Sequence, residues 1–400
     1  MAAALAEAGY AVSIVSPIYG EGVYERDLLF LADPRWHGTP VKLVRRFQPW
    51  TYFRTALRLK LARRLLLRGA LGRRSVVSLA RGYTRAFDEL LARAVAQPAD
   101  LYLGGTGSGM AVAARAAELR GVPFALDLED FHSAEQEPSP EANLSHGIIA
   151  ELERRLLPRA AFLTGGSGPI CQAYFDRYGL PVETIHNTFS LPPSPPSFAL
   201  DPAGRLRIFW YSQVIGLKRG LEDAVHAVGL SGASADLCLL GHDTSGSMDS
   251  LKALASHYSP GLKLVHREPI APEAIPTLAG QFDVGLALEQ NSPVNRDLCL
   301  TNKAFTYMLA GLGVAFTDTT GQRPLAKDIG PDALLFKPGD IETFAAGLRR
   351  WVEQPESLLT ARRAAWAAAV RRWHWEHPEE RGKALALVQQ ALDAIKVSVA

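Results

Sequence analysis

The 400-residue sequence has few cysteines, no long apolar run and, over one stretch, no acidic residue. Its three cysteines, Cys171, Cys238 and Cys299, are far apart and form no CxxC pair. This argues against a disulfide framework or a zinc site and favours a reducing compartment. No run approaches the roughly 18 apolar residues of a membrane-spanning helix, and the N-terminus lacks the basic-then-apolar layout of a signal peptide. We therefore expect a cytoplasmic protein.

Acidic residues are absent between Asp33 and Asp88. The gap contains fourteen cations: Arg35, Lys42, Arg45, Arg46, Arg54, Arg58, Lys60, Arg63, Arg64, Arg68, Arg73, Arg74, Arg81 and Arg85. Because the net charge of the whole chain is only +2, the remainder carries about −12. Such asymmetry indicates an anionic partner surface.

This basic segment, residues 35–85, also contains Trp50, Tyr52 and Phe53. Cations interleaved with aromatic residues suit an anionic membrane surface, here the inner face of the membrane, to which the protein would attach peripherally. On a helical wheel, however, the cations do not separate from the leucines. Nucleic acid is the competing partner, although we expect none, and a solvated helical insertion is the third interpretation.

The rest of the composition is that of a globular protein, with 48% hydrophobic and 21% charged residues. Four hundred residues exceed what one core usually serves, so we expect two domains. Apolar runs alternate with helical patterns before and after a proline-dense stretch, which predicts parallel α/β sheets in both halves. We predict an N-terminal Rossmann-like domain over residues 1–190, a linker over 191–204, a second Rossmann-like domain over 205–370 and a C-terminal helix over 371–400 that packs back toward the first domain.

The start of the chain departs from this pattern. The sequence begins inside a helix, MAAALAEAG, and continues into the buried strand expected in YAVSIVSP, whereas a doubly wound domain normally starts with its central strand. A missing middle strand would leave buried backbone groups unpaired on both neighbours. We expect that roughly 15–25 residues precede this start, about one strand and loop, or that another segment fills the gap.

The stretch LCLTNKAFTYMLAGLGVAF, residues 298–316, reads as a loop, a short helix, a glycine stop and a buried strand. We predict that the Thr301 hydroxyl caps the helix beginning at Asn302. A helix N-terminus at the carboxyl edge of a sheet offers backbone donors to a phosphate, and Asn302 and Lys303 add side-chain donors. A purely structural helix in a β/α unit is the alternative.

Two further stretches carry candidate catalytic groups. Lys218 and Arg219 fall in the loop between an expected strand and helix, where preorganised cations could neutralise a diphosphate leaving group; a solvated basic turn is the alternative. LDLEDFHSAE places five polar candidates at the end of another strand: Asp127, Glu129, Asp130, His132 and Glu135. Acids at the mouth of an interdomain cleft could supply a general base, and loop acids that cap the next helix are the alternative.

Taken together, the motifs resemble the group 1 (family 4-like) glycosyltransferases of the GT-B fold. The resemblance covers nearly the whole chain and rests on the order of eight stretches: ALAEAGYAVSIVSP, LDLEDF, ELERRLLPRAAFLTGGSGPI, HNTFSLPP, GLKRGLEDAVHAV, LTNKAFTYMLAG, LFKPGDIETFAAGL and WHWE. It implies an α/β protein with two Rossmann-like domains whose parallel sheets face a cleft. It also implies a nucleotide-sugar donor held mainly by the C-terminal domain, with neither metal nor other cofactor.

The site residues of the family carry over only in part. The basic pair for the donor diphosphate would fall on Gln213 and Arg219, of which only Arg219 is basic, with Lys218 beside it. The two glutamates of the family would fall on Leu298 and Thr306, and its N-domain histidine on Glu129. We expect that Glu289 or Asp297 replaces the missing ribose-binding acid and that Thr306 hydrogen-bonds or packs.

The resemblance therefore implies a rewired transferase that moves a sugar from a nucleotide-sugar to a glycan or lipid-linked acceptor in cell-surface polysaccharide or glycoconjugate synthesis. Arg219 and Lys218 would stabilise the departing diphosphate, and Glu129 or Asp130 would face the acceptor. A catalytically degenerate GT-B protein that binds a sugar, nucleotide or partner, and a nucleotide-sugar epimerase of the same fold, are the alternatives.

Overall fold

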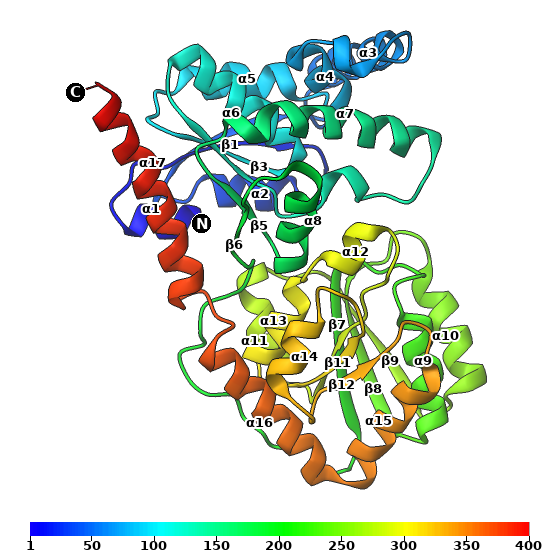
Figure 1. Ribbon diagram of the computed structural model, residues 1–400. Coiled ribbons are helices and arrows are strands. Elements are labelled where there is room, and N and C mark those ends of the chain that lie inside the picture. Colours follow the sequence, from blue (N-terminus) through cyan, green and yellow to red (C-terminus); the bar gives the residue numbers. More distant parts are fainter. Residues whose placement is uncertain (400) are drawn as a thin grey trace. The chain divides into compact units, whose positions relative to one another are not determined.

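The computed structural model describes the backbone of residues 1–399 and the side chains of residues 1–394. The chain divides into two compact units (Figure 1). Unit 1 combines Met1–Ile185 with the C-terminal segment that begins at Pro378, and unit 2 is His186–His377. The proline-dense residues 191–204 form neither helix nor strand.

Unit 2 is built on a six-stranded parallel sheet in the order β12-β11-β10-β7-β8-β9. The strands are β7 (Leu206–Val214), β8 (Ala235–His242), β9 (Leu262–Arg267), β10 (Val284–Ala287), β11 (Gly313–Thr317) and β12 (Leu334–Phe336). The chain winds outward from β7 to β9 and then returns to β10 on the other side of β7. The sheet is therefore doubly wound, with its topological switch point between β7 and β10.

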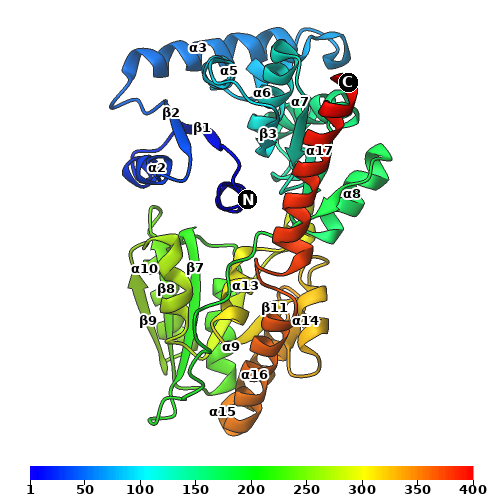
Figure 2. The same ribbon diagram turned by 90° about the vertical axis from the view of Figure 1, so that its left-hand side faces the viewer.

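Helices cover both faces of this sheet (Figure 2), which is why its strands read as nearly continuous apolar runs. The helices α9 (Leu221–Ser231), α10 (Ser247–Tyr258) and α15 (Ile341–Glu353) share a core with Trp210 on one face. On the other face, α11 (Ile275–Ala279), α13 (Asn302–Leu309), α14 (Arg323–Ile329) and α16 (Pro355–Arg371) pack around Phe209. The short helix α12 (Val294–Leu298) lies between β10 and α13.

Unit 1 contains two separate parallel sheets rather than one. The first pairs β1 (Ser13–Ile18) with β2 (His37–Lys42), and the second has the order β3 (Tyr102–Gly105), β4 (Phe124–Asp127), β5 (Leu163–Gly165) and β6 (Glu183–Thr184). Its helices are α1 (Ala2–Glu7), α2 (Tyr24–Leu31), α3 (Pro49–Leu66), α4 (Val76–Tyr83), α5 (Phe87–Ala96), α6 (Thr106–Arg120), α7 (Pro140–Leu156), α8 (Gly168–Tyr178) and α17 (Lys383–Val399).

The prediction of a buried first strand was wrong. Only Ile18 of β1 is buried, and the preceding residues of this strand are exposed or half-buried. The physical reason is that β1 has a strand partner on one edge only, since no strand among residues 1–399 joins β1 to β3. No helix in the part of the chain that the structure describes is both long and apolar enough to cross a bilayer.

Candidate functional site

The candidate site lies in unit 2, at the carboxyl ends of β7 and β10. Ligands of open α/β sheets bind at the crevice where the strand order reverses, and here the reversal falls between these two strands. The loop that follows β7 carries Lys218 and Arg219, and the segment that follows β10 carries Glu289 and leads through α12 to α13. The sheet therefore brings together Arg219 and Glu289, which lie 70 positions apart in the sequence.

A small pocket of about 10 Å³ occupies this position. It is lined by Trp210, Arg219, Leu288, Glu289, Gln290, Arg296 and Lys303. Three of these seven residues are cations and one is an acid, so the pocket has an excess of positive charge. A larger, open hollow beside α14 contains none of the predicted site residues.

Arg219 reaches the pocket because the turn before α9 is tightly constrained. Its guanidinium Nη1 donates hydrogen bonds to Ser212 Oγ at 2.8 Å and to the Val214 carbonyl at 3.0 Å, and the group lies 5.4 Å from the Trp210 ring centre. The next residue, Gly220, has a φ of +79°, a conformation that costs little only for glycine. The side chain is thus oriented by contacts on the protein before any ligand binds.

Arg296 is a second pocket cation, and sequence reasoning missed it. It is half-buried on α12, and the described residues give its guanidinium no ion pair. Burial lowers the pKa of Arg219, and Arg296 lowers that pKa further while Glu289 opposes the shift. Two guanidinium groups that repel each other across one pocket form a pre-built site for an anion such as a diphosphate.

Glu289 and Lys303 are paired inside the pocket wall. Lys303 Nζ lies 2.6 Å from Glu289 Oε1, and both side chains are about nine-tenths buried. Burial by itself raises the pKa of Glu289, but Lys303, Arg219 and the Thr301 hydroxyl hold it below its usual value. Glu289 therefore stays ionised, as the acid expected to bind a ribose must.

The predicted capping role of Thr301 was wrong. Thr301 occupies the N-cap position of α13, but its side chain makes no capping hydrogen bond. Its hydroxyl instead donates to Glu289 Oε1 at 3.1 Å, a charge-assisted hydrogen bond that orients the side chain toward the carboxylate. The first turn of α13 is thereby left without a side-chain cap. The prediction of a helix that begins at Asn302 and stops before a glycine was confirmed, with Gly311 at a φ of +68°.

Two of the predicted donor-binding residues are engaged within the protein. Thr306 is fully buried, and its hydroxyl lies 2.8 Å from the Tyr211 hydroxyl. Asp297 accepts hydrogen bonds from the Thr320 amide at 3.1 Å and the Thr320 hydroxyl at 2.6 Å. Thr306 thus packs and hydrogen-bonds as the sequence led us to expect, whereas Asp297 fastens α12 to the loop that follows β11.

The remaining predicted residues of unit 2 differ in exposure. Lys218 and Gln213 are exposed, and neither lines the pocket. Lys218 adopts a left-handed φ of 61° and its backbone amide donates to Glu222 Oε1 at 2.7 Å, which fixes the turn. Asn302 is half-buried at the start of α13.

The predicted acids of unit 1 lie at the end of β4 and just after it. Glu129 is exposed and Asp130 is half-buried. Asp127 accepts a hydrogen bond from Thr164 at 2.9 Å, and burial raises its pKa. The two acids therefore differ in their surroundings: Asp127 is hydrogen-bonded within the protein, whereas Glu129 is exposed.

A buried polar cluster lies beside these acids; the sequence had singled out its His132 and Glu135, but its Glu153 was missed. Glu153 is fully buried and accepts hydrogen bonds from Tyr174 at 3.0 Å and Tyr178 at 2.7 Å. His132 is buried as well; its Nδ1 lies 3.4 Å from Glu135, and its Nε2 has no hydrogen-bond partner. Glu153 lies in the helical stretch ELERRLL, and nothing in that stretch predicts that it is buried. The tyrosines that donate hydrogen bonds to it come from a different helix, α8.

Substituting Gly220 tests how closely the turn before α9 packs against Leu288. A Cβ atom at residue 220 would lie 2.8 Å from Leu288 Cβ, whereas one at Gly232, with a similar φ of +71°, would meet nothing within 4 Å. Both alanine variants carry the backbone strain, about 1 kcal/mol, but only Gly220→Ala adds a clash of about 1–3 kcal/mol. Urea unfolding should therefore show a larger decrease in the free energy of unfolding for Gly220→Ala than for Gly232→Ala. Equal decreases would contradict the close approach of the Gly220 backbone to Leu288.

Comparisons with known proteins place the chain by its fold. No protein-family model matches the sequence, and no curated protein matches it. Among solved structures, Anabaena HepE in complex with UDP and glucose is 16% identical with a TM-score of 0.63, covering 99% of this chain and 94% of that one. Sucrose-phosphate synthase from Thermosynechococcus elongatus is 15% identical with a TM-score of 0.69, covering 98% and 92%.

A third solved structure extends the series. The E. coli trehalose-6-phosphate protein bound with UDP-2-fluoro glucose is 13% identical with a TM-score of 0.62, covering 98% of this chain and 94% of that one. These are GT-B structures, and at such low identity the similarity establishes the fold alone. The chain therefore has the GT-B fold with two Rossmann-like domains, and the prediction of that α/β fold class is confirmed.

Proposed function

We propose that the protein is a glycosyltransferase that takes its sugar from a nucleotide-diphosphate sugar. The observation that carries this proposal is the pocket at the switch point, where Arg219 and Arg296 converge beside the first turn of α13. A helix start and two guanidinium groups are suited to the phosphates of a donor. The neighbours solved with UDP or UDP-glucose support the same class of ligand.

The chemistry that this arrangement supports is group transfer with a stabilised leaving group. The bond between the anomeric carbon and the diphosphate oxygen breaks, and the diphosphate leaves with the electron pair. An acceptor hydroxyl oxygen forms the new bond to that carbon and loses its proton. Arg219 and Arg296 oppose the negative charge that develops on the diphosphate, and such preorganised charge is often the largest catalytic contribution.

Nucleotide binding by the wild type provides the first test. A ligand that binds only the folded state raises its stability, by about 2.7 kcal/mol at a hundredfold excess over Kd. In a melting-temperature screen of nucleoside diphosphates against the full chain, at least one should raise the midpoint. A screen in which no diphosphate shifts the midpoint would contradict the proposal.

The variant Arg296→Ala tests the anion site itself. We expect it to weaken binding of that diphosphate by roughly 1.5–3 kcal/mol, as for a lost charge-assisted hydrogen bond. The same variant should leave affinity for the corresponding nucleoside, which lacks phosphates, unchanged. An equal loss for both ligands would assign Arg296 a structural role instead.

The degenerate binding protein and the epimerase are distinguished by reaction products. With donor and acceptor present, a transferase releases free nucleoside diphosphate together with a heavier acceptor. An epimerase changes the donor without any acceptor, and a degenerate protein consumes nothing. The absence of Glu from the positions of Leu298 and Thr306 motivates this comparison.

The acceptor side of the proposal rests on Glu129 and Asp130. If one of these carboxylates accepts the hydroxyl proton, the transfer inverts the configuration of the anomeric carbon. NMR of the product determines the anomer, and a retained configuration would remove both residues from the role of base. The proposed acceptor is a glycan or a lipid-linked sugar.

A further inference from the structure

Helix α3 presents apolar side chains outward along its whole length. Trp50 is 88% exposed, Phe53 51%, Leu57 59%, Leu61 49% and Leu65 57%. Their spacing of three or four residues places them on one face of the helix. A row of five large apolar side chains in water is unusual, since exposed apolar residues of a monomer are normally scattered.

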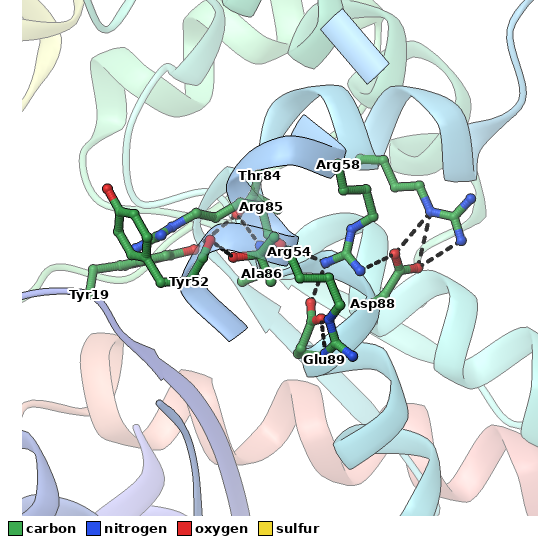
Figure 3. A network of polar contacts seen from close by, with 11 residues as sticks. Tyr19, Tyr52, Arg54, Arg58, Thr84, Arg85, Ala86, Asp88 and Glu89 are labelled. Atoms are coloured by element: carbon green, nitrogen blue, oxygen red, sulfur yellow. Dashed lines mark hydrogen bonds and ion pairs between the residues drawn. The ribbon is translucent and has the colours of Figure 1, made fainter. Parts of the chain in front are cut away.

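The opposite face of α3 is held to unit 1 by charge rather than by a wide apolar seam (Figure 3). Arg58 pairs with Asp88, with Nη1 3.0 Å from Oδ2, and also with Glu89. One turn later, Arg63 lies 2.7 Å from Glu141 and donates to the Gly82 carbonyl. Because these inward arginines are neutralised by acids from α5 and α7, α3 is anchored while its leucines and aromatic residues face outward.

Exposed cations without an acidic partner lie on α3 and just after it, since Arg68 follows the last residue of the helix, Leu66. Lys60, Arg64 and Arg68 are exposed, and none forms an ion pair with an acidic side chain among residues 1–394. The chain supplies no acid between Asp33 and Asp88. The face therefore combines an apolar row with uncompensated positive charge.

We propose that α3 is an interfacial helix that seats unit 1 on an anionic lipid surface. Trp50, Phe53 and the leucines enter the boundary between headgroups and acyl chains, and Lys60, Arg64 and Arg68 contact lipid phosphates. This binding site goes beyond the proposed sugar transfer and does not depend on it.

Charge argues against the other occupants of this face. Two copies of α3 packed face to face would bring the same unpaired cations together with no acid between them, which is destabilising. A polynucleotide would satisfy the cations but leave Leu57, Leu61 and Leu65 in water. An anionic bilayer is the partner that satisfies both features.

Vesicle flotation of the full-length protein tests this proposal. Wild type should float with phosphatidylcholine vesicles that contain phosphatidylglycerol, and at least about tenfold less with pure phosphatidylcholine. Leu57→Glu with Leu61→Glu should lower the partition coefficient by roughly tenfold or more. The matched control is Leu119→Glu with Leu230→Glu, which changes two leucines of 52% and 53% exposure elsewhere and should float like wild type.

A charge variant separates the two features of the face. Lys60→Gln with Arg64→Gln and Arg68→Gln should lower partition onto anionic vesicles on the order of 100-fold, since each cation contributes to the attraction. Vesicles of lipids with brominated acyl chains should quench the tryptophan fluorescence of the wild type more than that of Trp50→Leu, because Trp50 would lie near the acyl chains. Thermal unfolding of each variant without lipid confirms that the fold is retained.

Three results would overturn the proposal. The first is equal flotation with both vesicle compositions, and the second is flotation of the leucine variant like its matched control. The third is a dimer of the lipid-free protein that the leucine variant abolishes, which would assign α3 to an interface between two copies.

Discussion

Replacing Arg219 with alanine is expected to lower the turnover of nucleotide-sugar roughly 30- to 1000-fold, which corresponds to about 2–4 kcal/mol of lost transition-state stabilisation. The guanidinium lines the pocket and is oriented by Ser212 and Val214. It is already partly removed from water in the folded protein, and this burial lowers its pKa. The loss should appear mainly in kcat, because charge on the diphosphate grows as the glycosidic bond breaks.

Two companion variants make this expectation specific. Arg350→Ala removes an exposed guanidinium from α15 and should leave kcat within about twofold of wild type, as surface substitutions usually do. Lys218→Ala removes an exposed ammonium beside Arg219 that does not line the pocket. We expect it to have a smaller effect than Arg219→Ala, because water screens an exposed charge.

The kinetics of the three variants decide between the roles of the two cations. A kcat of Arg219→Ala equal to that of Arg350→Ala would remove Arg219 from the mechanism. A larger decrease in kcat for Lys218→Ala than for Arg219→Ala would mean that the leaving group binds at the exposed side of the turn, beside Lys218. Steady-state assays with the donor at saturating concentration provide the comparison.

Replacing Arg362 with methionine is expected to destabilise unit 2 by about 3–5 kcal/mol. Arg362 and Asp283 are both 1% exposed and lie 3.2 Å apart. The guanidinium also donates to the Gly311 carbonyl at 2.8 Å and to the Ser197 carbonyl at 2.8 Å. Without it, two carbonyls lose their donor, and within the described residues the Asp283 carboxylate keeps only the hydrogen bonds from Arg207, the nearest guanidinium nitrogen being 2.7 Å away.

The neighbouring residue supplies the control for this substitution. Arg363 is exposed, so Arg363→Met makes the same chemical change one position along α16 without unpairing a buried group. Calorimetry should show a midpoint lowered by roughly 6–20 °C for Arg362→Met and by a few degrees at most for Arg363→Met. Similar midpoints for the two variants would mean that the buried ion pair contributes little.

The fold of unit 2 could be predicted from the sequence because local patterns decide it. Apolar runs such as LRIFWYSQ and FDVGLALE became β7 and β10, and glycine stops such as Gly311 ended helices where expected. The two separate sheets of unit 1 could not be predicted with the same success. A strand's own residues do not show which neighbour it pairs with. The sequence therefore could not show that β1 pairs with β2 alone and not with β3.

The candidate site was predictable only where a residue's role is local. Arg219 and Lys303 could be proposed because each sits at a loop-to-helix junction. Arg296 could not, since its approach to Arg219 depends on the order of β7 and β10 in the sheet. The hydroxyl of Thr301 was assigned to the helix because the nearby carboxylate of Glu289 comes from 12 residues upstream.

The outward face of α3 shows the same limit. A helical wheel mixes arginines with leucines, because Leu59 and Leu66 lie away from the row that Trp50, Phe53, Leu57, Leu61 and Leu65 form. The inward arginines can be told from the outward cations only in the structure, where Asp88, Glu89 and Glu141 pair with the inward ones. Those acids lie on α5 and α7, outside the segment that the wheel represents.

The most direct test of the account is a crystal structure of the full chain with the nucleoside diphosphate that raises the melting temperature most. The account predicts that the two phosphates lie against the first turn of α13, with Arg219 and Arg296 in contact with them. Phosphates bound elsewhere, with the pocket lined by Trp210 and Glu289 left without ligand, would contradict it.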